Sequence, residues 1–287
     1  MATAAAPRDP GLPAVRLLNA WFCPFAQRAW IALEEAGVDF ENVQAMSISK
    51  DEVNYDKTPE LLEANPNGLV PTVLRFDENG NRLGCVYESM ICVEYVHEAL
   101  WEAGGKAGRI FPENVEQRAR CRIWIDFVGK KLVPPFYRML VKTDEAEREE
   151  AKQSLREAMV TFAQAMPPAT DGPFFLGKEF SAVDISFAPW AHRMFVLQHY
   201  RAFDWHAGAG GAAAAGTEEE GAGNRESTLA GMAMARFDVW MGATLARSSV
   251  VATLAEHAAL IGTYKRYADN VTTSQVAESV RAGRALP

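Results

Sequence analysis

The chain has 287 residues, of which 48% are hydrophobic and 23% are charged, and its formal net charge is −8. Such a composition is typical of a globular protein with one large or two smaller domains, and the negative charge argues against a nucleic-acid surface. No apolar run approaches the roughly 18 residues of a membrane span, so we expect neither nucleic-acid nor membrane partners.

The cysteine pattern and the N-terminal residues indicate in which cellular compartment the protein is expected. The four cysteines, Cys23, Cys85, Cys92 and Cys121, have the spacing of neither a disulfide framework nor a zinc site. Residues 1–12 are rich in alanine and proline and lack the apolar core of a secretory signal. We therefore expect a disordered tail, a cytoplasmic protein in a reducing compartment, and no bound metal.

The first predicted elements surround a cysteine. The apolar run 15–19 predicts a strand, and residues 29–37 predict a helix that Gly37 closes. Between them, residues 21–28 read Trp-Phe-Cys-Pro-Phe-Ala-Gln-Arg, and Pro24 suits the first position of the helix. This places the sulfur of Cys23 over the free backbone N–H groups and the positive dipole end of the helix.

A thiol in that position differs from an ordinary one. A free cysteine has a pKa near roughly 8.5, and a helix N-terminus can lower it to about 3.5–7.5. Arg28, one turn further on, is expected to add positive charge. Ala26 stands where a C-x-x-C motif has its second cysteine, so a disulfide of Cys23 would form most easily with a soluble thiol. The alternative, a small buried apolar residue, stays open on the local pattern.

The next residues predict an α/β domain. Residues 40–46 predict a second strand, parallel to the first across the helix between them. Residues 51–64 are polar and predict a loop that holds a short helix at 58–63. Residues 69–76 predict a strand. Pro71 lies near the start of this strand, where a missing N–H is tolerated.

A hairpin and a helix complete this domain. Asn79-Gly80 lies between the strand-like runs 69–76 and 82–87, a pattern typical of a tight turn. Residues 90–100 predict a helix, and we expect Ser89 to be its N-cap.

Beyond a Gly/Pro-containing linker at 102–112, the chain has no strand-like runs. Ser181 and Asp184 resemble a capping box, and residues 207–228, rich in alanine, glycine and acids, predict a flexible insertion. Helices are predicted at 113–138, with a kink or break at Pro134-Pro135, and at 143–166, 184–200, 230–246 and 250–269. We thus expect a tail at 1–12, an α/β domain at 13–101, the linker, and an all-helical domain at 113–287.

Three motifs in this order resemble glutathione transferases. They are Cys-Pro-Phe-Ala-Gln-Arg at 23–28, Asn-Pro-x-Gly-x-Val-Pro-Thr at 65–72 and Tyr-Glu-Ser at 87–89. Cysteine in place of serine or tyrosine makes the chain similar to the omega and lambda classes. The resemblance covers about residues 15–269 and implies a thioredoxin-like N-terminal domain, an all-α C-terminal bundle, glutathione as co-substrate, a role in detoxification and a homodimer.

The resemblance also implies site residues. Cys23, flanked by Pro24 and Phe25, would form the mixed disulfide with glutathione. Pro24 and Phe25 would also belong to the glutathione site. Lys57 would hold the glycine carboxylate of glutathione, and the backbone of Val70, before a cis Pro71, would pair with its cysteinyl part. Glu88 and Ser89 would hold its γ-glutamyl end. A hydroxyl at a helix start suits a carboxylate. The plainer readings are a surface lysine, a strand-starting proline and a simple helix cap.

The resemblance and the thiol together suggest redox chemistry. We expect a glutathione-dependent thiol transferase, an oxidoreductase that removes glutathione from mixed disulfides or reduces dehydroascorbate-type oxidants through Cys23. The alternatives are a glutathione S-transferase that conjugates glutathione to small electrophiles, and a non-enzymatic protein that binds glutathione or another ligand in a regulatory role.

Overall fold

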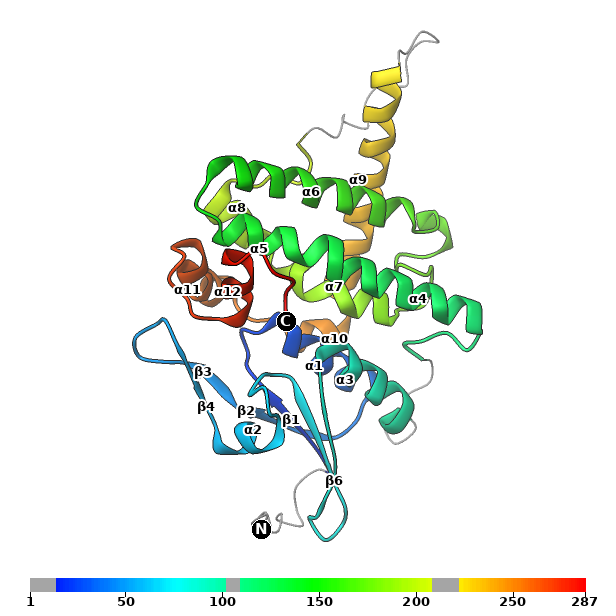
Figure 1. Ribbon diagram of the computed structural model, residues 1–287. Helices are drawn as coiled ribbons and strands as arrows, with labels where there is room; N and C mark the ends of the chain where they lie inside the picture. The colour runs from blue at the N-terminus through cyan, green and yellow to red at the C-terminus, as the bar shows by residue number, and fades with distance from the viewer. Residues whose placement is uncertain (1–13, 102–108, 208–221) are drawn as a thin grey trace. The chain divides into compact units, whose positions relative to one another are not determined.

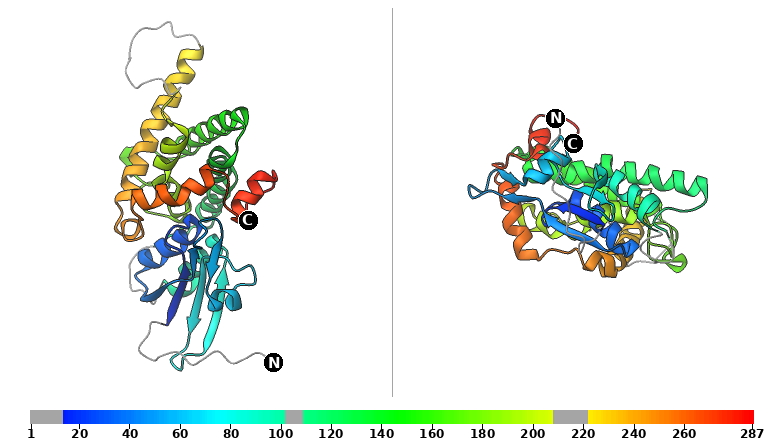
Figure 2. Two further views of the ribbon diagram at one scale, coloured as in Figure 1. Left: turned by 90° about the vertical axis from the view of Figure 1, so that its left-hand side faces the viewer. Right: turned by 90° about the horizontal axis from the view of Figure 1, so that it is seen from below.

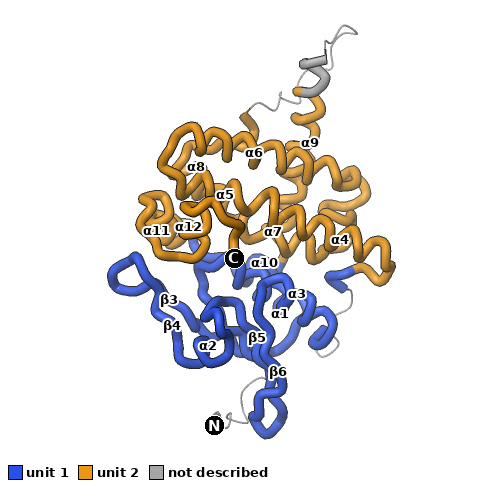
Figure 3. The backbone as a smooth tube through the Cα atoms, viewed as in Figure 1, with its two compact units in different colours: residues 1–111, 248–256 blue, residues 112–247, 257–287 orange. Residues whose placement is uncertain are grey.

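The computed structural model describes residues 14–101, 109–207 and 222–287. They form two compact units, one of residues 14–101, 109–111 and 248–256, the other of residues 112–207, 222–247 and 257–287 (Figure 3). The predicted tail at 1–12, most of the predicted linker and residues 208–221 of the predicted insertion lie outside the described residues. No helix in the described part of the chain combines the length and hydrophobicity that a membrane crossing requires.

A four-stranded mixed sheet is the centre of unit 1 (Figures 1 and 2). Its strands are β1 (Val15–Asn19), β2 (Phe40–Gln44), β5 (Thr72–Phe76) and β6 (Arg82–Tyr87). Their order is β2-β1-β5-β6, with β2 parallel to β1 and the two other pairings antiparallel. The parallel pair confirms the strand–helix–strand prediction, and the hairpin of β5 and β6 confirms the turn at Asn79-Gly80.

The helices of unit 1 pack their apolar faces inward. Those from the first 111 residues are α1 (Pro24–Ala36), α2 (Pro59–Ala64) and α3 (Ser89–Tyr95), the last continuing as a π-helical turn (Val96–Leu100). The short helix α10 (Ser248–Val251) also belongs to this unit. Gly37 ends α1 with φ of 71°, a left-handed conformation that glycine adopts without strain. Fully buried Ala29, Ile31 and Leu33 anchor α1 in the core.

A second, two-stranded sheet was not predicted. Strands β3 (Met46–Ile48) and β4 (Tyr55–Lys57) pair antiparallel, so residues 55–57 are not the loop that the polar sequence suggested. Asp51 organises the turn between them, because its carboxylate accepts hydrogen bonds from the Ser49 hydroxyl and from the N–H groups of Val53 and Asn54. These hydrogen bonds lower the pKa of Asp51 well below its ordinary value.

Unit 2 is helical. Its α-helices are α4 (Val115–Phe127), α5 (Val133–Val141), α6 (Glu145–Gln164), α7 (Ala182–His192), α8 (Met194–Arg201), α9 (Ala222–Ala246), α11 (His257–Ala268) and α12 (Gln275–Arg281). A π-helical turn, Val128–Leu132, joins α4 to α5, and Pro134-Pro135 lie in the first turn of α5, where proline is tolerated. The capping box of Ser181 and Asp184 at the start of α7 is confirmed.

Two predictions for the C-terminal helices were wrong. The insertion does not extend to residue 228, because α9 is already helical from Ala222. One helix was predicted at 250–269, but the chain forms α10 (Ser248–Val251) and α11 there. Between them lies a turn in which the Thr253 N–H donates to the Val250 carbonyl. Beyond the last predicted helix, the chain also forms α12, whose N-cap is Ser274.

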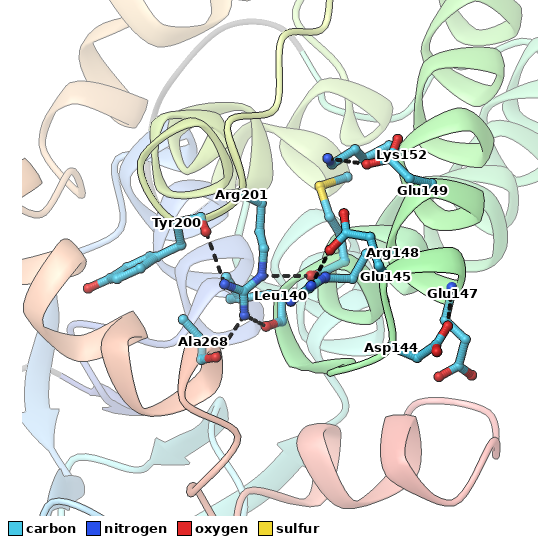
Figure 4. A network of polar contacts seen from close by, with 11 residues as sticks. Leu140, Asp144, Glu145, Glu147, Arg148, Glu149, Lys152, Tyr200, Arg201 and Ala268 are labelled. Carbon is cyan, nitrogen blue, oxygen red and sulfur yellow. Dashed lines mark hydrogen bonds and ion pairs between the residues drawn. The ribbon is translucent and has the colours of Figure 1, made fainter.

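One arginine ties together the carboxyl ends of three helices in unit 2 (Figure 4). The guanidinium of Arg201 donates to the carbonyls of Met139 and Leu140 near the end of α5, at 3.0 and 2.5 Å. It also donates to the carbonyl of Ala268, the last residue of α11, at 2.7 Å, and to that of Tyr200 in α8 at 3.0 Å. These carbonyls lack partners within their own helices, and a cation suits that end of the dipole.

Candidate functional site

Cys23 occupies the position that the sequence predicted. It is the N-cap of α1, with φ of −83° and ψ of 115°, and Pro24 follows as the first helical residue. Its N–H donates to the Ala20 carbonyl at 2.9 Å, which closes the turn after β1, and its own carbonyl accepts the Gln27 N–H at 3.0 Å. The thiol is half-buried. The backbone on both sides therefore fixes this residue between strand and helix.

The surroundings of the sulfur differ from the prediction. The side chain of Cys23 makes no capping hydrogen bond to α1. Its Sγ instead lies 4.0 Å from the carbonyl oxygen of Val70. A carbonyl oxygen favours the protonated thiol, which donates to it, whereas the helix dipole favours the thiolate. The Val70 carbonyl and the helix dipole therefore favour opposite ionisation states of Cys23, and the sequence revealed only the dipole.

Val70 belongs to a loop that a buried asparagine organises. The Asn65 side-chain amide donates to the Leu69 carbonyl at 2.9 Å and to the Thr72 hydroxyl at 3.1 Å. Its side-chain oxygen accepts the Asn67 N–H at 2.9 Å. The Val70-Pro71 peptide bond is cis, as the resemblance implies, and both residues are buried. Asn65 therefore holds the backbone that faces the Cys23 sulfur.

Lys57 lies beside the same loop. It ends β4, is half-buried and pairs with Met46 of β3. A Cβ atom placed on Gly68 would be 3.1 Å from the Lys57 ammonium nitrogen. The ammonium group therefore lies against the backbone two residues before Val70, which is consistent with the predicted role in holding a carboxylate.

The sequence predicted Ser89 as the N-cap of α3, and this prediction was wrong. Ser89 is the first residue of the helix, and Glu88 is the N-cap, because the Glu88 backbone has φ of 70° and its carbonyl accepts the Cys92 N–H at 2.8 Å. A positive φ is uncommon for a residue other than glycine and is often found where a site requires it. Glu88 is exposed and Ser89 is half-buried.

Arg28 has contacts that sequence reasoning did not predict. Predicted to add charge near Cys23, it donates from Nη1 to the Ser89 hydroxyl at 3.1 Å and lies over the Phe25 ring at 5.6 Å. Arg28 is only 5% exposed. A charged residue next to Ala29, on the buried face of an apolar helix, was the available signal. Because Ser89 accepts from Arg28, its own O–H remains able to donate to an anionic group.

The predicted residues are thus connected in pairs within unit 1. The Cys23 sulfur lies beside the Val70 carbonyl, and the Lys57 ammonium group lies beside Gly68 in the same loop. The Ser89 hydroxyl accepts a hydrogen bond from Arg28 of α1, the helix that begins after Cys23. The predicted roles of these residues in binding glutathione, that of Glu88 included, stay predictions.

Two family models match the chain. The model of the "Glutathione S-transferase, N-terminal domain" matches residues 22–99, and that of the "Glutathione S-transferase, C-terminal domain" matches residues 145–214. The first match includes every residue from Cys23 to Ser89 discussed above.

Individual relatives agree with the family models. Glutathione S-transferase U22 of Arabidopsis thaliana is 36% identical over 173 residues, 60% of this chain and 70% of the relative. Glutathione S-transferase omega-1 of Mus musculus is 30% identical over 187 residues, 64% of this chain and 68% of the relative. The crystal structure of glutathione transferase Omega 3C from Trametes versicolor has a TM-score of 0.65 and 29% identity, over 90% of this chain and 91% of that one.

The similar proteins do not settle the class. The Tau class glutathione S-transferase from mango has a TM-score of 0.66 at 21% identity, over 88% of this chain and 98% of that one, which supports the fold alone. The fold is that of a thioredoxin-like domain with a mixed sheet followed by a helical domain, as predicted. The sequence matches and the fold together show that the chain belongs to the glutathione S-transferase family.

Proposed function

We propose that this glutathione S-transferase is a thiol transferase whose nucleophile is Cys23. The observation that carries the proposal is a cysteine as the N-cap of α1, with its sulfur against the cis-proline loop at Val70. A thiolate is intrinsically a strong nucleophile, and a position at a helix N-terminus increases the fraction that is ionised. The cysteine also supports assignment to the omega- or lambda-like classes.

The reaction consists of two thiol–disulfide exchanges. In the first, the Cys23 thiolate attacks the glutathione sulfur of a mixed disulfide, and the other thiol leaves as a thiolate. A Cys23–glutathione disulfide forms. In the second, a glutathione thiolate attacks the glutathione sulfur of that disulfide, which regenerates the Cys23 thiolate and releases oxidised glutathione. Ala26 provides no second thiol to resolve the intermediate, so the second glutathione is required.

The other site residues would bind glutathione. Lys57 would pair with its glycine carboxylate, and the Val70 backbone would bond to the cysteinyl residue. Glu88 and Ser89 would hold the γ-glutamyl ammonium and carboxylate groups. We also assign Pro24, Phe25 and Pro71 to the glutathione site, where the two proline rings would restrict the backbone on either side of the sulfur.

Conjugation of glutathione to electrophiles is the second candidate. It is favoured by the names of relatives such as glutathione S-transferase U22 and by the carbonyl of Val70 beside Sγ, which favours the neutral thiol. A neutral Cys23 would donate a hydrogen bond to a bound glutathione thiolate rather than attack a disulfide.

Parallel assays on the wild-type protein, Cys23→Ala and Cys23→Ser distinguish the two. Thiol transfer is measured with a glutathionylated peptide and conjugation with a chloronitrobenzene. The proposal predicts that both variants lose thiol transfer. Conjugation that exceeds thiol transfer in the wild type and survives in Cys23→Ser would support the second candidate instead.

We also propose a homodimer, from the family resemblance, and the domain boundaries at 13–101 and 113–287, from the linker-like composition between them. Light scattering coupled to size exclusion tests the first, and limited proteolysis between residues 101 and 113 tests the second. A monomer at micromolar concentration, or cleavage confined to other positions, would contradict them.

A further inference from the structure

A segment from late in the chain is part of unit 1. Residues 248–256, here called the α1 strap, begin with α10 and group with the first 111 residues, although residues 247 and 257 on either side belong to unit 2. In Figure 3 the strap has the colour of unit 1. α10 packs against α1, the helix that Cys23 begins. The sequence placed this segment in the helical domain.

The strap contacts the first turn of α1 through a buried amide. Gln27 donates from Nε2 to the Thr253 hydroxyl at 3.1 Å and to the Thr253 carbonyl at 3.3 Å. Both residues are only 2% exposed. The Gln27 backbone N–H in turn donates to the Cys23 carbonyl at 3.0 Å. A continuous set of hydrogen bonds therefore connects Thr253 to the residue that carries the nucleophile.

The Thr253 hydroxyl is itself held in one orientation. It donates to the Val250 carbonyl at 2.8 Å, so its oxygen is available to accept from Gln27. Replacing threonine with valine would keep the shape and remove both bonds of the hydroxyl. The Gln27 amide would then lose one of the two acceptors that Thr253 provides, in a buried environment where that loss is costly.

The strap contacts the last turn of α1 as well. The Ser249 hydroxyl donates to the Glu35 carboxylate at 2.5 Å, and Ser249 is 4% exposed. Glu35 lies eight residues after Gln27, about 12 Å along the helix. The strap is thus bonded to α1 near Cys23 and again far from it, which provides a matched internal control.

A buried amide is a poor choice for stability alone, since an apolar residue of similar volume would fill the space without a desolvation cost. Its bonds are directional and specify one position of the helix. We propose that Gln27 and Thr253 are positioning residues for Cys23: the α1 strap fixes the first turn of α1 and so the orientation of the thiol. For the enzymatic reaction this rests on the thiol transferase function proposed above.

The experiment compares three full-length variants, Thr253→Val, Thr253→Ser and Ser249→Ala. Two quantities are measured: the pH dependence of Cys23 alkylation by iodoacetamide, with the modified residue identified by peptide mapping, and kcat/KM for thiol transfer. Urea unfolding gives the stability of each variant. Alkylation needs no assumption about the reaction, so it tests the positioning of Cys23 even where the proposed function fails.

We expect Thr253→Val to shift the alkylation midpoint upward by about half a pH unit and to lower kcat/KM about 3- to 10-fold, as the loss of one hydrogen bond implies. Thr253→Ser, which keeps the hydroxyl, restores both. Ser249→Ala loses stability but keeps the wild-type alkylation profile. No titratable group changes in any variant; those on α1 and on the segments around it include Arg16, Arg28, Glu34, Glu35, Lys57, Glu88, Cys92, Glu94, Tyr95, His97, Glu98 and Glu256.

Wild-type alkylation in Thr253→Val would overturn the proposal, as would identical effects of Thr253→Val and Ser249→Ala. Absence of thiol transfer in the wild-type protein is a separate result, which would refute the proposed function while the alkylation profiles still decide the positioning of Cys23.

Discussion

The Sγ atom of Cys23 lies 4.0 Å from the carbonyl oxygen of Val70, the residue before the cis proline. The two residues are 47 positions apart and meet because β1 and β5 are adjacent in the sheet, with α1 following one and the cis-proline loop preceding the other. The contact sets the nucleophile beside a backbone acceptor. A bound glutathione could pair with that backbone while its sulfur faces Cys23, so the contact is the geometric basis of the proposed mechanism.

The cysteines are predicted to react in a definite order. Burial raises the pKa of the Cys85 thiol and that of the Cys92 thiol above their ordinary values, so both are protonated at neutral pH. We expect iodoacetamide at pH 7 to modify Cys23 first. In Cys23→Ala, modification of the native protein should become appreciable only at alkaline pH. Rapid modification of Cys85 at pH 7 in that variant would contradict the assignment.

Lys57 is predicted to contribute through its charge. Lys57→Met should raise the KM for glutathione roughly tenfold, the magnitude of one charge-assisted hydrogen bond. The difference from wild type should shrink as salt is increased, because screening weakens the interaction of a half-exposed ammonium group. Lys50→Met, at an exposed position of the neighbouring turn, is the matched control. Equal KM values for Lys57→Met and wild type would exclude the role.

The absence of a side chain at Gly68 should be required for the observed position of the Lys57 ammonium group. The φ of Gly68 is +56°, and an added Cβ would be 3.1 Å from both Lys57 Nζ and Leu62 Cδ2. Gly68→Ala should therefore raise the KM for glutathione as Lys57→Met does, and should destabilise the protein by about 1 kcal/mol through the left-handed backbone. In the double variant the two KM effects should not add, since both displace one ammonium group. Additive effects would show that Gly68 acts elsewhere.

Ser89 is predicted to bind glutathione with its hydroxyl. Ser89→Ala should raise the KM for glutathione about 2- to 10-fold, with kcat at saturation little changed, because the hydrogen bond is made equally before and during reaction. Ser47→Ala, at an exposed position of β3, is the control. A fall in kcat without a change in KM would instead indicate that Ser89 acts on the α1 helix through Arg28.

Arg201 should be important for the stability of unit 2. Arg201→Met leaves carbonyls near the ends of α5 and α11 without their donor, and we expect a loss of about 3 kcal/mol in the free energy of unfolding. Arg148→Met, which removes the partner of Glu145 on the surface of α6, should change it little. Figure 4 shows both arginines. Urea unfolding measures the difference, and equal stabilities of the two variants would contradict the prediction.

The elements that the sequence predicted well are those whose signals are local. Pro24 after Cys23 and Gly37 at the other end mark both limits of α1, and the pair Ser181 and Asp184 marks the start of α7. These residues act on backbone groups within a few positions, so their effect can be read without knowing the fold. The glutathione transferase motifs then supplied the order of the elements.

The features that were missed depend on distant contacts. α10 and the turn at Thr253 replace part of a predicted helix. Thr253 accepts a hydrogen bond there from Gln27, which is 226 positions away in the sequence. The hydrogen bond from Arg28 to the Ser89 hydroxyl joins two helices, and the sequence did not predict it. The carbonyl of Val70 beside Sγ has no side-chain signal at all. Local patterns do not reveal these contacts, because each joins residues that are far apart in the sequence.

The most direct test of the account is intact mass spectrometry of the wild-type protein and of Cys23→Ala after treatment with oxidised glutathione, followed by peptide mapping. The account predicts one glutathione adduct on wild type, located at Cys23, reversed by added glutathione and absent from Cys23→Ala. A wild-type protein that stays unmodified, or an adduct that persists in Cys23→Ala, would contradict it.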